Sequence, residues 1–424
     1  MKQVIPTAKT KIDAMIAIPG SKSITNRALV LAALAVGTSR LTGLLLSDDT
    51  LACIQGLRAL GIDIQLDSDA KSAVVIGCSG QFPVLNATIQ CQRAGTVARF
   101  LMAAAAGTPG EYTFDADAQL RVRPMHALLH VLWQQGARLL SSQNEMPLTF
   151  LGANQLHGGQ IEINDAASSQ FVSALLMISP YAKHDVKILT TNNVRPAYID
   201  MTLAMMLKFG VTVTSVQPQE YVIAVPRSYQ ACSYEIEPDL SSASYFFAAA
   251  ALTQGKVRIA PFAKQSLQPD AAFLSILAAM GCHVVNTPSE LSVEGPDVLM
   301  GVEVDMRDCS DTFMTLAAIA PFAKTPTNIK NIAHTRLQES DRITAMCAGL
   351  RALGVRVEEA QDGLVIYPST PKSATIDTHQ DHRIAMAFAV LGLRVPGVAL
   401  LGAECVAKTF PDFFAVWQRE FSSI

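Results

Sequence analysis

Cationic residues at expected helix starts are the part of this sequence best suited to chemistry. The segment Ile18–Leu29 reads IPGSKSITNRAL, in which Pro-Gly ends a β-like run and Ser21 or Ser23 can cap the helix that follows. Free amides, a hydroxyl and the ammonium of Lys22 at a helix start attract an anion. Arg27 stands one turn after Ser23 on the same face. An ordinary capped helix with a surface lysine is the alternative for this segment alone.

Three more segments of the first half offer anion-binding groups. In RAGTVARF, Gly95 and Thr96 open a helix, and glycine lets an anion approach the backbone amides closely. Arg123 precedes a proline at a second expected helix start, where a solvated arginine is the alternative. In ASSQF, hydroxyls and an amide precede an apolar helix and can bind phosphate by neutral hydrogen bonds; they are Ser168, Ser169 and Gln170. Helix capping is the alternative there.

The second half adds acids that could move protons. Asp311 stands at an expected helix start in CSDTF, where an N-cap is the simpler interpretation. Glu339 and Arg342, in QESDR, are predicted to lie three apart on one helical face. A surface ion pair of small energetic value is the alternative for these two residues.

Three further basic residues complete this set. His382 and Arg383 open a strongly apolar helix, where the helix dipole disfavours cations, so an anion is expected nearby. Lys408 follows in VAKTF, where a solvent-facing lysine is the alternative. The cations beside Gly, Ser, Pro or acidic turns together predict a site for one or two polyanions: Lys22, Arg27, Arg123, Arg342, Arg383 and Lys408. Such a site fits several enzymes that transfer or eliminate phosphate.

A repeated pattern indicates how these segments are positioned. An apolar helical run, a glycine and an alternating β-like run recur five times, with the glycines at intervals of 71 to 75 residues: Gly61, Gly136, Gly210, Gly281 and Gly354. Glycine after a helix is typical of the left-handed C′ position. Chance helix–glycine–strand junctions are the alternative, but the near-constant interval favours an internal repeat.

The repeat predicts an α/β protein of two similar domains with three units each and a cleft between them. We expect the division between the domains near the turn Glu237–Ser242. The terminal PDFFAVWQREF resembles the helix of an incomplete last unit. An N-terminal strand could complete that unit, so one domain would contain both chain ends.

Composition limits the function classes. The chain is 50% hydrophobic and 16% charged with a net charge of -3, which gives no basic field for nucleic acid. Its eight cysteines show no CxxC pair or zinc spacing and are expected to be reduced, and no metal site is predicted. No secretory signal and no membrane-length apolar run occur, so we expect a cytoplasmic location.

Six segments, PGSKSITNRAL, AGTVAR, SSQF, ESDRI, DHRIAMAFAV and KTFPDFF, resemble the 5-enolpyruvylshikimate-3-phosphate synthase family in order and over almost the whole chain. The resemblance implies two domains, each an inside-out α/β barrel-like assembly of three βαβαββ units. They would comprise residues 1–20 plus 240–424, and 21–239. It also implies transfer of the enolpyruvyl group of phosphoenolpyruvate to shikimate 3-phosphate, on the shikimate pathway to chorismate and aromatic amino acids. We expect a monomer without a cofactor.

The resemblance also implies residue roles. Shikimate 3-phosphate would be held by Lys22, Ser23, Arg27, Ser168, Ser169 and Gln170, with Lys22 and Gln170 also reaching phosphoenolpyruvate. Phosphoenolpyruvate would be surrounded by Gly95, Arg123, Arg342, Arg383 and Lys408. Asp311 would accept the proton of the 5-hydroxyl, and Glu339 would protonate the methylene carbon. Further predicted site residues are Thr96, Arg195 and Gln338 for binding, with Lys22 and His382 among the catalytic residues.

Five positions depart from the family's usual residues. They are Arg93 for Asn, Phe100 for Pro, Arg195 for Ser, His334 for Asn and Gln338 for Lys. Gln338 can donate hydrogen bonds but supplies no charge. We hypothesise that Arg93 or Arg195 replaces the lost cation.

Two other functions are alternatives to this one. The UDP-N-acetylglucosamine enolpyruvyl transferases share fold and donor, but this chain lacks their SGxxNA-like opening and a loop cysteine near Arg121 to Arg123. A catalytically inactive binding relative is the other alternative. The retained acids and cations argue against it, whereas Gln338 keeps it open.

Overall fold

The computed structural model describes residues 2–8, 11–141, 145–163, 168–190, 196–215, 217, 219–260 and 266–421. The chain forms two compact units. Unit 1 comprises Met1–Pro19 and Pro238–Ile424, and unit 2 comprises Gly20–Glu237.

Unit 2 contains three sheets. Their strand orders are β13-β3-β5-β4 (Ser233–Glu235, Thr38–Thr42, Ser72–Ile76, Asp63–Asp67), β6-β7-β9-β8 (Asn86–Gln90, Gly110–Asp115, Leu148–Gly152, Arg138–Leu139) and β10-β11-β12 (Gly159–Ile163, Val186–Thr190, Glu220–Ile223). Each begins with a parallel pair, β13 with β3, β6 with β7 and β10 with β11, and continues antiparallel. A parallel pair needs a crossover, which a helix provides between β6 and β7 and between β10 and β11, whereas most of the unit lies between β3 and β13.

Three helices form the core of unit 2. They are α1 (Lys22–Leu34), α3 (Gly95–Ala106) and α6 (Ser169–Ile178), and almost all of their residues are buried. Helices that are apolar on all sides belong inside a protein, which explains this position. The half-buried helices α2 (Asp48–Ala59), α5 (His126–Gln134) and α7 (Ala197–Lys208) accompany them, with the short α4 (Ala118–Arg121) before α5.

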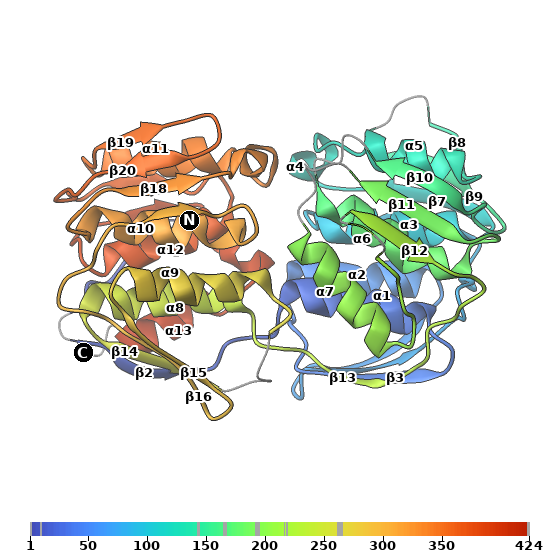
Figure 1. Cartoon of the computed structure of the whole chain (residues 1–424), viewed down its shortest axis with the longest axis horizontal. Coiled ribbons are helices and arrows are strands. Elements are labelled where there is room, and N and C mark those ends of the chain that lie inside the picture. Colours follow the sequence, from blue (N-terminus) through green and yellow to red (C-terminus); the bar gives the residue numbers. More distant parts are fainter. Residues whose placement is uncertain are drawn as a thin grey trace. The chain divides into compact units, whose positions relative to one another are not determined.

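Unit 1 repeats this arrangement with its own three sheets. Their strand orders are β15-β16-β14-β2 (His283–Thr287, Glu290–Glu294, Lys256–Ile259, Asp13–Ile16), β17-β18-β20-β19 (Glu303–Asp305, Thr327–Lys330, Leu364–Ile366, Val357–Glu359) and β1-β22-β21 (Lys2–Val4, Ala399–Leu401, Thr375–Asp377). In Figure 1, β18 to β20 lie on one side of unit 1 and β2 and β14 to β16 lie on the other, with helices between them. β1 pairs antiparallel with β22, so the N-terminal strand completes the last repeat.

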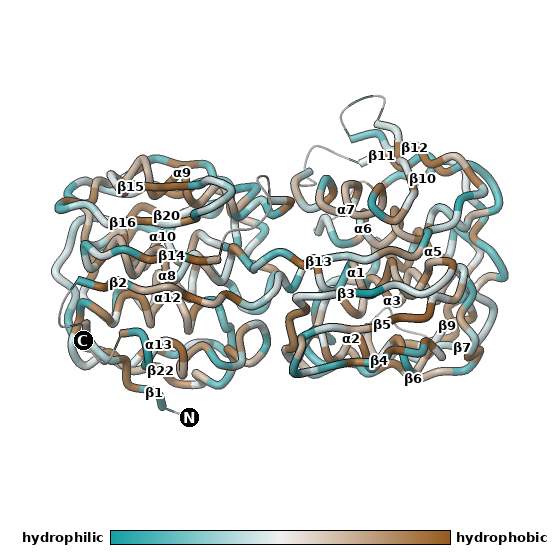
Figure 2. Tube along the Cα trace, turned by 90° about the horizontal axis from the view of Figure 1, so that it is seen from below, coloured by the Kyte–Doolittle hydropathy of each residue, from teal (hydrophilic) through white to brown (hydrophobic). Residues whose placement is uncertain are grey.

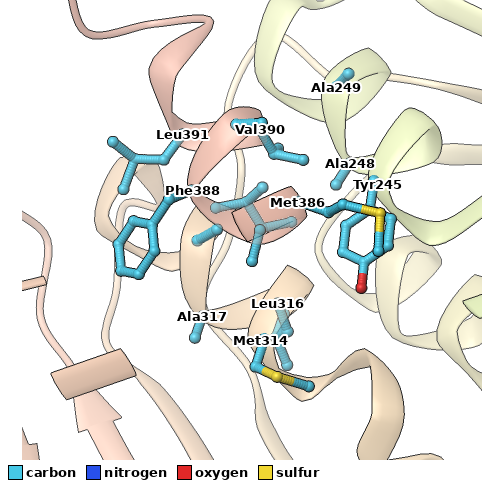
Figure 3. Close-up of a cluster of buried hydrophobic side chains, with 14 of the residues drawn as sticks. Tyr245, Ala248, Ala249, Met314, Leu316, Ala317, Met386, Phe388, Val390 and Leu391 are labelled. Carbon is cyan, nitrogen blue, oxygen red and sulfur yellow. The ribbon is translucent and has the colours of Figure 1, made fainter. Parts of the chain in front are cut away.

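The core of unit 1 consists of α8 (Leu240–Thr253), α10 (Phe313–Ile319) and α12 (His382–Gly392), all of whose residues are buried. Figure 3 shows Tyr245 of α8, Met314 of α10 and Met386 of α12 within one hydrophobic cluster. The outer helices are α9 (Ala272–Ala279), α11 (Arg342–Ala352) and α13 (Phe413–Phe421). Two 3-10 helices, η3 (Ser310–Thr312) and η5 (Ala333–Leu337), precede α10 and α11.

The repeat seen in the sequence is present in the fold. All five punctuating glycines have positive φ, from +77° at Gly354 to +104° at Gly136, as the left-handed C′ position requires. After Gly210 the expected strand is only an isolated bridge between Thr214 and Val222. The α/β class with three repeats per unit is confirmed. The described strands form separate sheets around central helices, not one closed barrel.

The distribution of hydrophobic residues follows this architecture. Figure 2 shows hydrophobic residues along the helices and strands, and hydrophilic residues chiefly in the outer turns. All eight cysteines are free thiols. Among the described residues, none of the helices has the length and apolar character needed to span a bilayer.

Candidate active site

The first turns of the three core helices of unit 1 bring acids and bases together. Asp239 caps α8 and accepts a hydrogen bond from the Ser242 amide at 2.7 Å. Asp381 caps α12 and accepts from the Arg383 amide at 2.9 Å. Amides at helix starts carry partial positive charge, so this end of the core favours anions. A cluster of paired acidic and basic side chains lies around these starts.

Arg342, the first residue of α11, is the centre of the cluster. It is 1% exposed, and its Nε donates to Asp381 Oδ2 at 2.8 Å. Its Nη1 donates to Asp311 Oδ1 at 3.2 Å, and its Nη2 donates to Glu339 Oε2 at 2.8 Å. Burial alone would lower the pKa of Arg342, but Asp381, Glu339 and Asp311 raise it above its usual value. The guanidinium is therefore always charged.

Asp311 lies in η3 and does not cap a helix, contrary to the simpler interpretation of its sequence position. Besides Arg342, its carboxylate accepts from Arg383 Nη2 at 2.8 Å. Burial would lower the pKa of Arg383, but Asp311 raises it well above the usual range. A carboxylate between two guanidinium groups is therefore fixed at the start of the core.

Glu339 is placed differently from the sequence prediction. It precedes α11, whose N-cap is Asp341, so Glu339 and Arg342 do not share a helical face. The two residues still form an ion pair, and Lys408 Nζ donates to the other oxygen of Glu339 at 2.8 Å. Lys408 is 4% exposed, and the Glu339 side chain is 11% exposed. These groups are therefore part of a buried cluster and are not solvated surface charges.

Asp381 and Asp270 are cluster members that the sequence analysis missed. Asp381 is fully buried and also accepts from Ser340 Oγ at 3.0 Å. Burial raises the pKa of Asp270 to about 7, with Asp311 adding to the rise and Arg383 opposing it. Both acids lie at or near helix starts, where Asp is common for capping alone, so their sequence positions give no functional signal. His382 is also fully buried, with Nδ1 3.7 Å from Asp381.

In unit 2, α1 begins beside a buried carboxylate. Ser21 is the N-cap of α1, although its side chain makes no capping hydrogen bond. Lys22 Nζ lies 3.4 Å from Asp49 Oδ2, and Asp49 is 2% exposed. Within the described residues, Asp49 Oδ1 has no hydrogen-bond partner. Asp49 could not be recognised from the sequence, because its SDDT context indicates only the capped start of α2.

Arg27 is held in the core of unit 2 by neutral acceptors. Its Nε donates to Thr202 Oγ1 at 2.8 Å, and its Nη1 donates to the Ser23 carbonyl at 3.0 Å. Its guanidinium carbon lies 5.1 Å from the ring centroid of Phe100. Burial lowers the pKa of Arg27 to about 10. A buried cation with these neutral partners provides positive potential beneath the start of α1.

The starts of α1, α3 and α6 are linked by side chains. Asn26 Nδ2 donates to Thr96 Oγ1 at 2.8 Å, and Arg99 Nη1 donates to Gln170 Oε1 at 2.5 Å. A Cβ on Gly95 would lie 2.9 Å from Arg123 Nη1, so the absence of a side chain leaves room for that guanidinium. Ser168 caps α6 through the Gln170 amide at 3.2 Å, and Ser169 begins the helix and is buried. Among the described residues, Asn26 Oδ1 and Arg123 Nε are buried without hydrogen-bond partners. Such groups suit a polar ligand.

Three of the departures from the family's usual residues have defined partners. Gln338 Oε1 accepts from Arg342 Nη1. His334 Nε2 lies 2.8 Å from Ser310 Oγ, next to Asp311. Arg93 forms a surface pair with Asp117, with Nε 3.3 Å from Oδ2. Arg195, the other proposed source of charge, lies outside the described residues.

The structure thus gathers the predicted residues into one cluster in each unit. The unit 1 cluster contains Asp311, Gln338, Glu339, Arg342, His382, Arg383 and Lys408. The unit 2 cluster contains Lys22, Ser23, Arg27, Gly95, Thr96, Arg123, Ser168, Ser169 and Gln170. Acids paired with several cations occur only in the first, and hydroxyl, amide and cationic donors dominate the second.

Comparison with known proteins agrees with these features. The chain is 45% identical to the 3-phosphoshikimate 1-carboxyvinyltransferase of Trichormus variabilis over 413 residues, 97% of each chain. It is 40% identical to the enzyme of the same name from Haemophilus ducreyi over 421 residues, 97% of this chain and 96% of the other.

Solved structures show the same fold at lower identity. The EPSP synthase of Acinetobacter baumannii superposes with a TM-score of 0.84 at 24% identity, over 99% of this chain and 98% of the other. The enolpyruvyl transferase NikO of Streptomyces tendae gives a TM-score of 0.75 at 18% identity, over 99% and 97%. The family model of EPSP synthase (3-phosphoshikimate 1-carboxyvinyltransferase) matches residues 6–417. With nearly the whole chain matched, the protein belongs to the EPSP synthase family.

Proposed function

We propose that this protein transfers the enolpyruvyl group of phosphoenolpyruvate to the 5-hydroxyl of shikimate 3-phosphate and releases phosphate. The observation that carries the proposal is the buried unit 1 cluster, in which Asp311 and Glu339 each contact two cations. The acids can exchange protons, and the cations can bind the phosphate and carboxylate of phosphoenolpyruvate. Membership of the EPSP synthase family supports this choice of substrates.

The unit 2 groups suit the acceptor. Shikimate 3-phosphate would bind to Lys22, Ser23, Arg27, Ser168, Ser169 and Gln170, with Thr96 and Arg195 as further contacts. Hydroxyls at the starts of α1 and α6 and the nearby backbone amides can bind its phosphate. Phosphoenolpyruvate would bind to Lys22, Gly95, Arg123, Gln170, Arg342, Arg383 and Lys408.

The acids divide the proton transfers. Glu339 delivers a proton to C3 of phosphoenolpyruvate, which makes C2 electrophilic, and Asp311 accepts the proton of the attacking 5-hydroxyl. The tetrahedral adduct then loses phosphate from C2 and returns a proton from C3 to Glu339, which forms the enol ether of the product. Arg342, Arg383 and Lys408 stabilise the departing phosphate.

Two further predicted residues, Gln338 and His382, have supporting roles in this proposal. Gln338 contacts Arg342 and would donate to the acceptor through its amide. His382 is fully buried beside Asp381, so we propose that it supports that carboxylate and does not touch substrate. We further propose that the two units are the two domains expected from the sequence. We expect a cytoplasmic monomer that needs no cofactor and binds neither nucleic acid nor membranes.

The test is phosphate release by the purified protein with phosphoenolpyruvate and shikimate 3-phosphate, with UDP-N-acetylglucosamine as a parallel acceptor. Release only with shikimate 3-phosphate, lost in Lys22→Ala and reduced to a slow residual rate in Glu339→Gln, is the expected result. Arg351→Ala, which removes a 51% exposed side chain, is the matched control and should keep full activity. Release with the UDP-sugar would identify the other transferase, and calorimetric binding without release would identify an inactive binding relative.

A further inference from the structure

An ion pair closes the base of the loop that carries Glu339. Arg336 belongs to η5, and Asp341 is the N-cap of α11. Arg336 Nη1 donates to both carboxylate oxygens of Asp341, at 3.0 Å to Oδ1 and 2.8 Å to Oδ2. Residues 338–340 therefore form a short loop after η5, and this contact joins η5 to the N-cap of α11 across the loop.

Arg336 is itself anchored to the turn between β19 and β20. Its Nε donates to the Gln361 carbonyl at 3.0 Å, and its Nη2 donates to the Ala360 carbonyl at 2.7 Å. Its Nη1 also donates to Glu359 Oε1 at 3.1 Å. A planar guanidinium can satisfy such divergent acceptors at once, whereas an ammonium cannot. The base of the loop is thus fixed to a sheet edge.

The other end of the loop is fixed as well. Asp341 accepts from the Thr344 amide at 3.0 Å, which caps α11, and Arg336 Nη1 donates to Thr344 Oγ1 at 2.9 Å. Burial would raise the pKa of Asp341, but the Thr344 amide and Arg336 lower it below its usual value. The carboxylate therefore remains charged, and the pair persists, at neutral pH.

This anchoring matters because of what holds the Glu339 side chain. Its carboxylate contacts Arg342 and Lys408, each at 2.8 Å. Under the proposed function these same cations bind the anionic donor, so they leave Glu339 when the substrate arrives. Arg342 keeps an independent anchor in Asp381, and the clamp between Arg336 and Asp341 holds the backbone on both sides of Glu339 in place. Correct placement of an acid by about 1 Å can change a rate by about 100-fold.

We propose that Arg336 and Asp341 form a clamp that positions Glu339 for proton transfer, an inference that rests on the proposed function. Arg336 is a positioning residue, since it acts through Glu339 and the substrates are assigned to other residues. The clamp extends the functional region of unit 1 to the β19–β20 turn.

The test compares Arg336→Ala and Arg336→Lys with Arg351→Ala. Arg351 also pairs with Glu359, with Nη1 3.5 Å from Oε2, but does not contact the loop. We expect kcat for phosphate release to fall about 10- to 100-fold in Arg336→Ala, less in Arg336→Lys, and not in Arg351→Ala. The KM values of both substrates should stay within about twofold of the parent. Raised KM values with unchanged kcat would overturn the proposal.

A double-substitution cycle separates positioning from general structural damage. The rate of phosphate release is measured in single turnovers at excess enzyme. When Glu339→Gln is already present, Arg336→Ala should not lower this rate further. An equal loss in both backgrounds would reject a role through Glu339. Should Arg336→Ala not fold, Asp341→Asn tests the same clamp, because Asn keeps the helix cap but removes the charge. A parent that releases no phosphate rejects the proposed function, whereas an active parent with an unaffected Arg336→Ala rejects the clamp alone.

Discussion

Replacing Asp381 by Asn should destabilise unit 1 strongly, although the change is nearly isosteric. Asp381 is fully buried, and its Oδ2 lies 2.8 Å from Arg342 Nε. Breaking one side of a buried ion pair costs about 3–5 kcal/mol. Arg342 keeps Asp311 and Glu339 as partners, so we expect the lower end, about 3 kcal/mol.

Two related substitutions show how much of this loss of stability comes from the helix cap and from one hydrogen bond. Asn caps a helix as well as Asp does, so Asp381→Asn leaves the start of α12 intact. Asp381→Ala should cost about 1 kcal/mol more because the cap is lost. Ser340→Ala, which removes one hydrogen bond to the same carboxylate, should cost only about 1 kcal/mol.

The two tryptophans allow the measurement to be made on unit 1. Trp417 lies in α13 of unit 1 and is 1% exposed, whereas Trp133 lies in α5 of unit 2 and is 61% exposed. Urea unfolding of each variant, followed by fluorescence in a Trp133→Phe background, therefore reports the free energy of unfolding of unit 1. A loss below about 1 kcal/mol in Asp381→Asn would refute the reasoning that Arg342 depends on this charge.

Three more predictions concern Gly95, Asp270, and the pair Arg93 and Arg195. Gly95→Ala places a Cβ 2.9 Å from Arg123 Nη1 and should displace that guanidinium. The KM for phosphoenolpyruvate should rise about tenfold, which corresponds to the loss of one hydrogen bond to a charged group. An unchanged KM would contradict this. The pKa of Asp270 is about 7 against an ordinary 3.8, so the folded state keeps a proton that the unfolded state loses. The free energy of unfolding should therefore fall as pH rises from about 4 to 7. Urea titrations at several pH values should show a smaller fall in Asp270→Asn, because that variant lacks the titrating carboxyl group. Substituting Arg93 and Arg195 together by Asn and Ser should sharply weaken calorimetric binding of shikimate 3-phosphate, whereas unchanged binding would mean that neither replaces the missing cation.

The repeat could be predicted from sequence because backbone geometry dictates it. The residue that ends a helix in the left-handed conformation is preferentially glycine, so Gly61 and its four counterparts mark the fold directly. The extended segment after Gly210 was predicted as a strand but forms only a bridge at Thr214. An alternating pattern shows that a strand is favourable, but pairing depends on a partner strand elsewhere in the chain.

Two of the predicted cluster residues have side chains that are unusual at their positions, whereas the roles of Asp311, Glu339 and Lys408 were predicted from the family resemblance. Cations such as His382 and Arg383 are unfavourable at a helix start because of the helix dipole, so both residues could be recognised as candidates for anion binding. Asp381, Asp270 and Asp49 are common at or near helix starts, so their burial and ion pairing could not be read from the sequence. Glu339 was identified, but its place before α11 was not, because the cap at Asp341 determines where the helix begins.

The paired acids and cations of unit 1 suggest how the site avoids unbalanced charge before substrate binds. Arg342, Arg383 and Lys408 are almost completely buried, and a buried cation without a partner would cost several kcal/mol. Asp311 and Glu339 remove this cost, and both are groups that the proposed reaction needs.

When the donor's phosphate and carboxylate replace Asp311 and Glu339 on the cations, Glu339 loses its neutralising partners and its protonation becomes more favourable. Binding of the anion would therefore favour the protonated acid, which is the form that can donate a proton to the methylene carbon. Calorimetric titration of phosphoenolpyruvate with shikimate 3-phosphate, in buffers of different ionisation enthalpy, should show proton uptake that Glu339→Gln abolishes. Equal uptake in both proteins would assign the proton to another group.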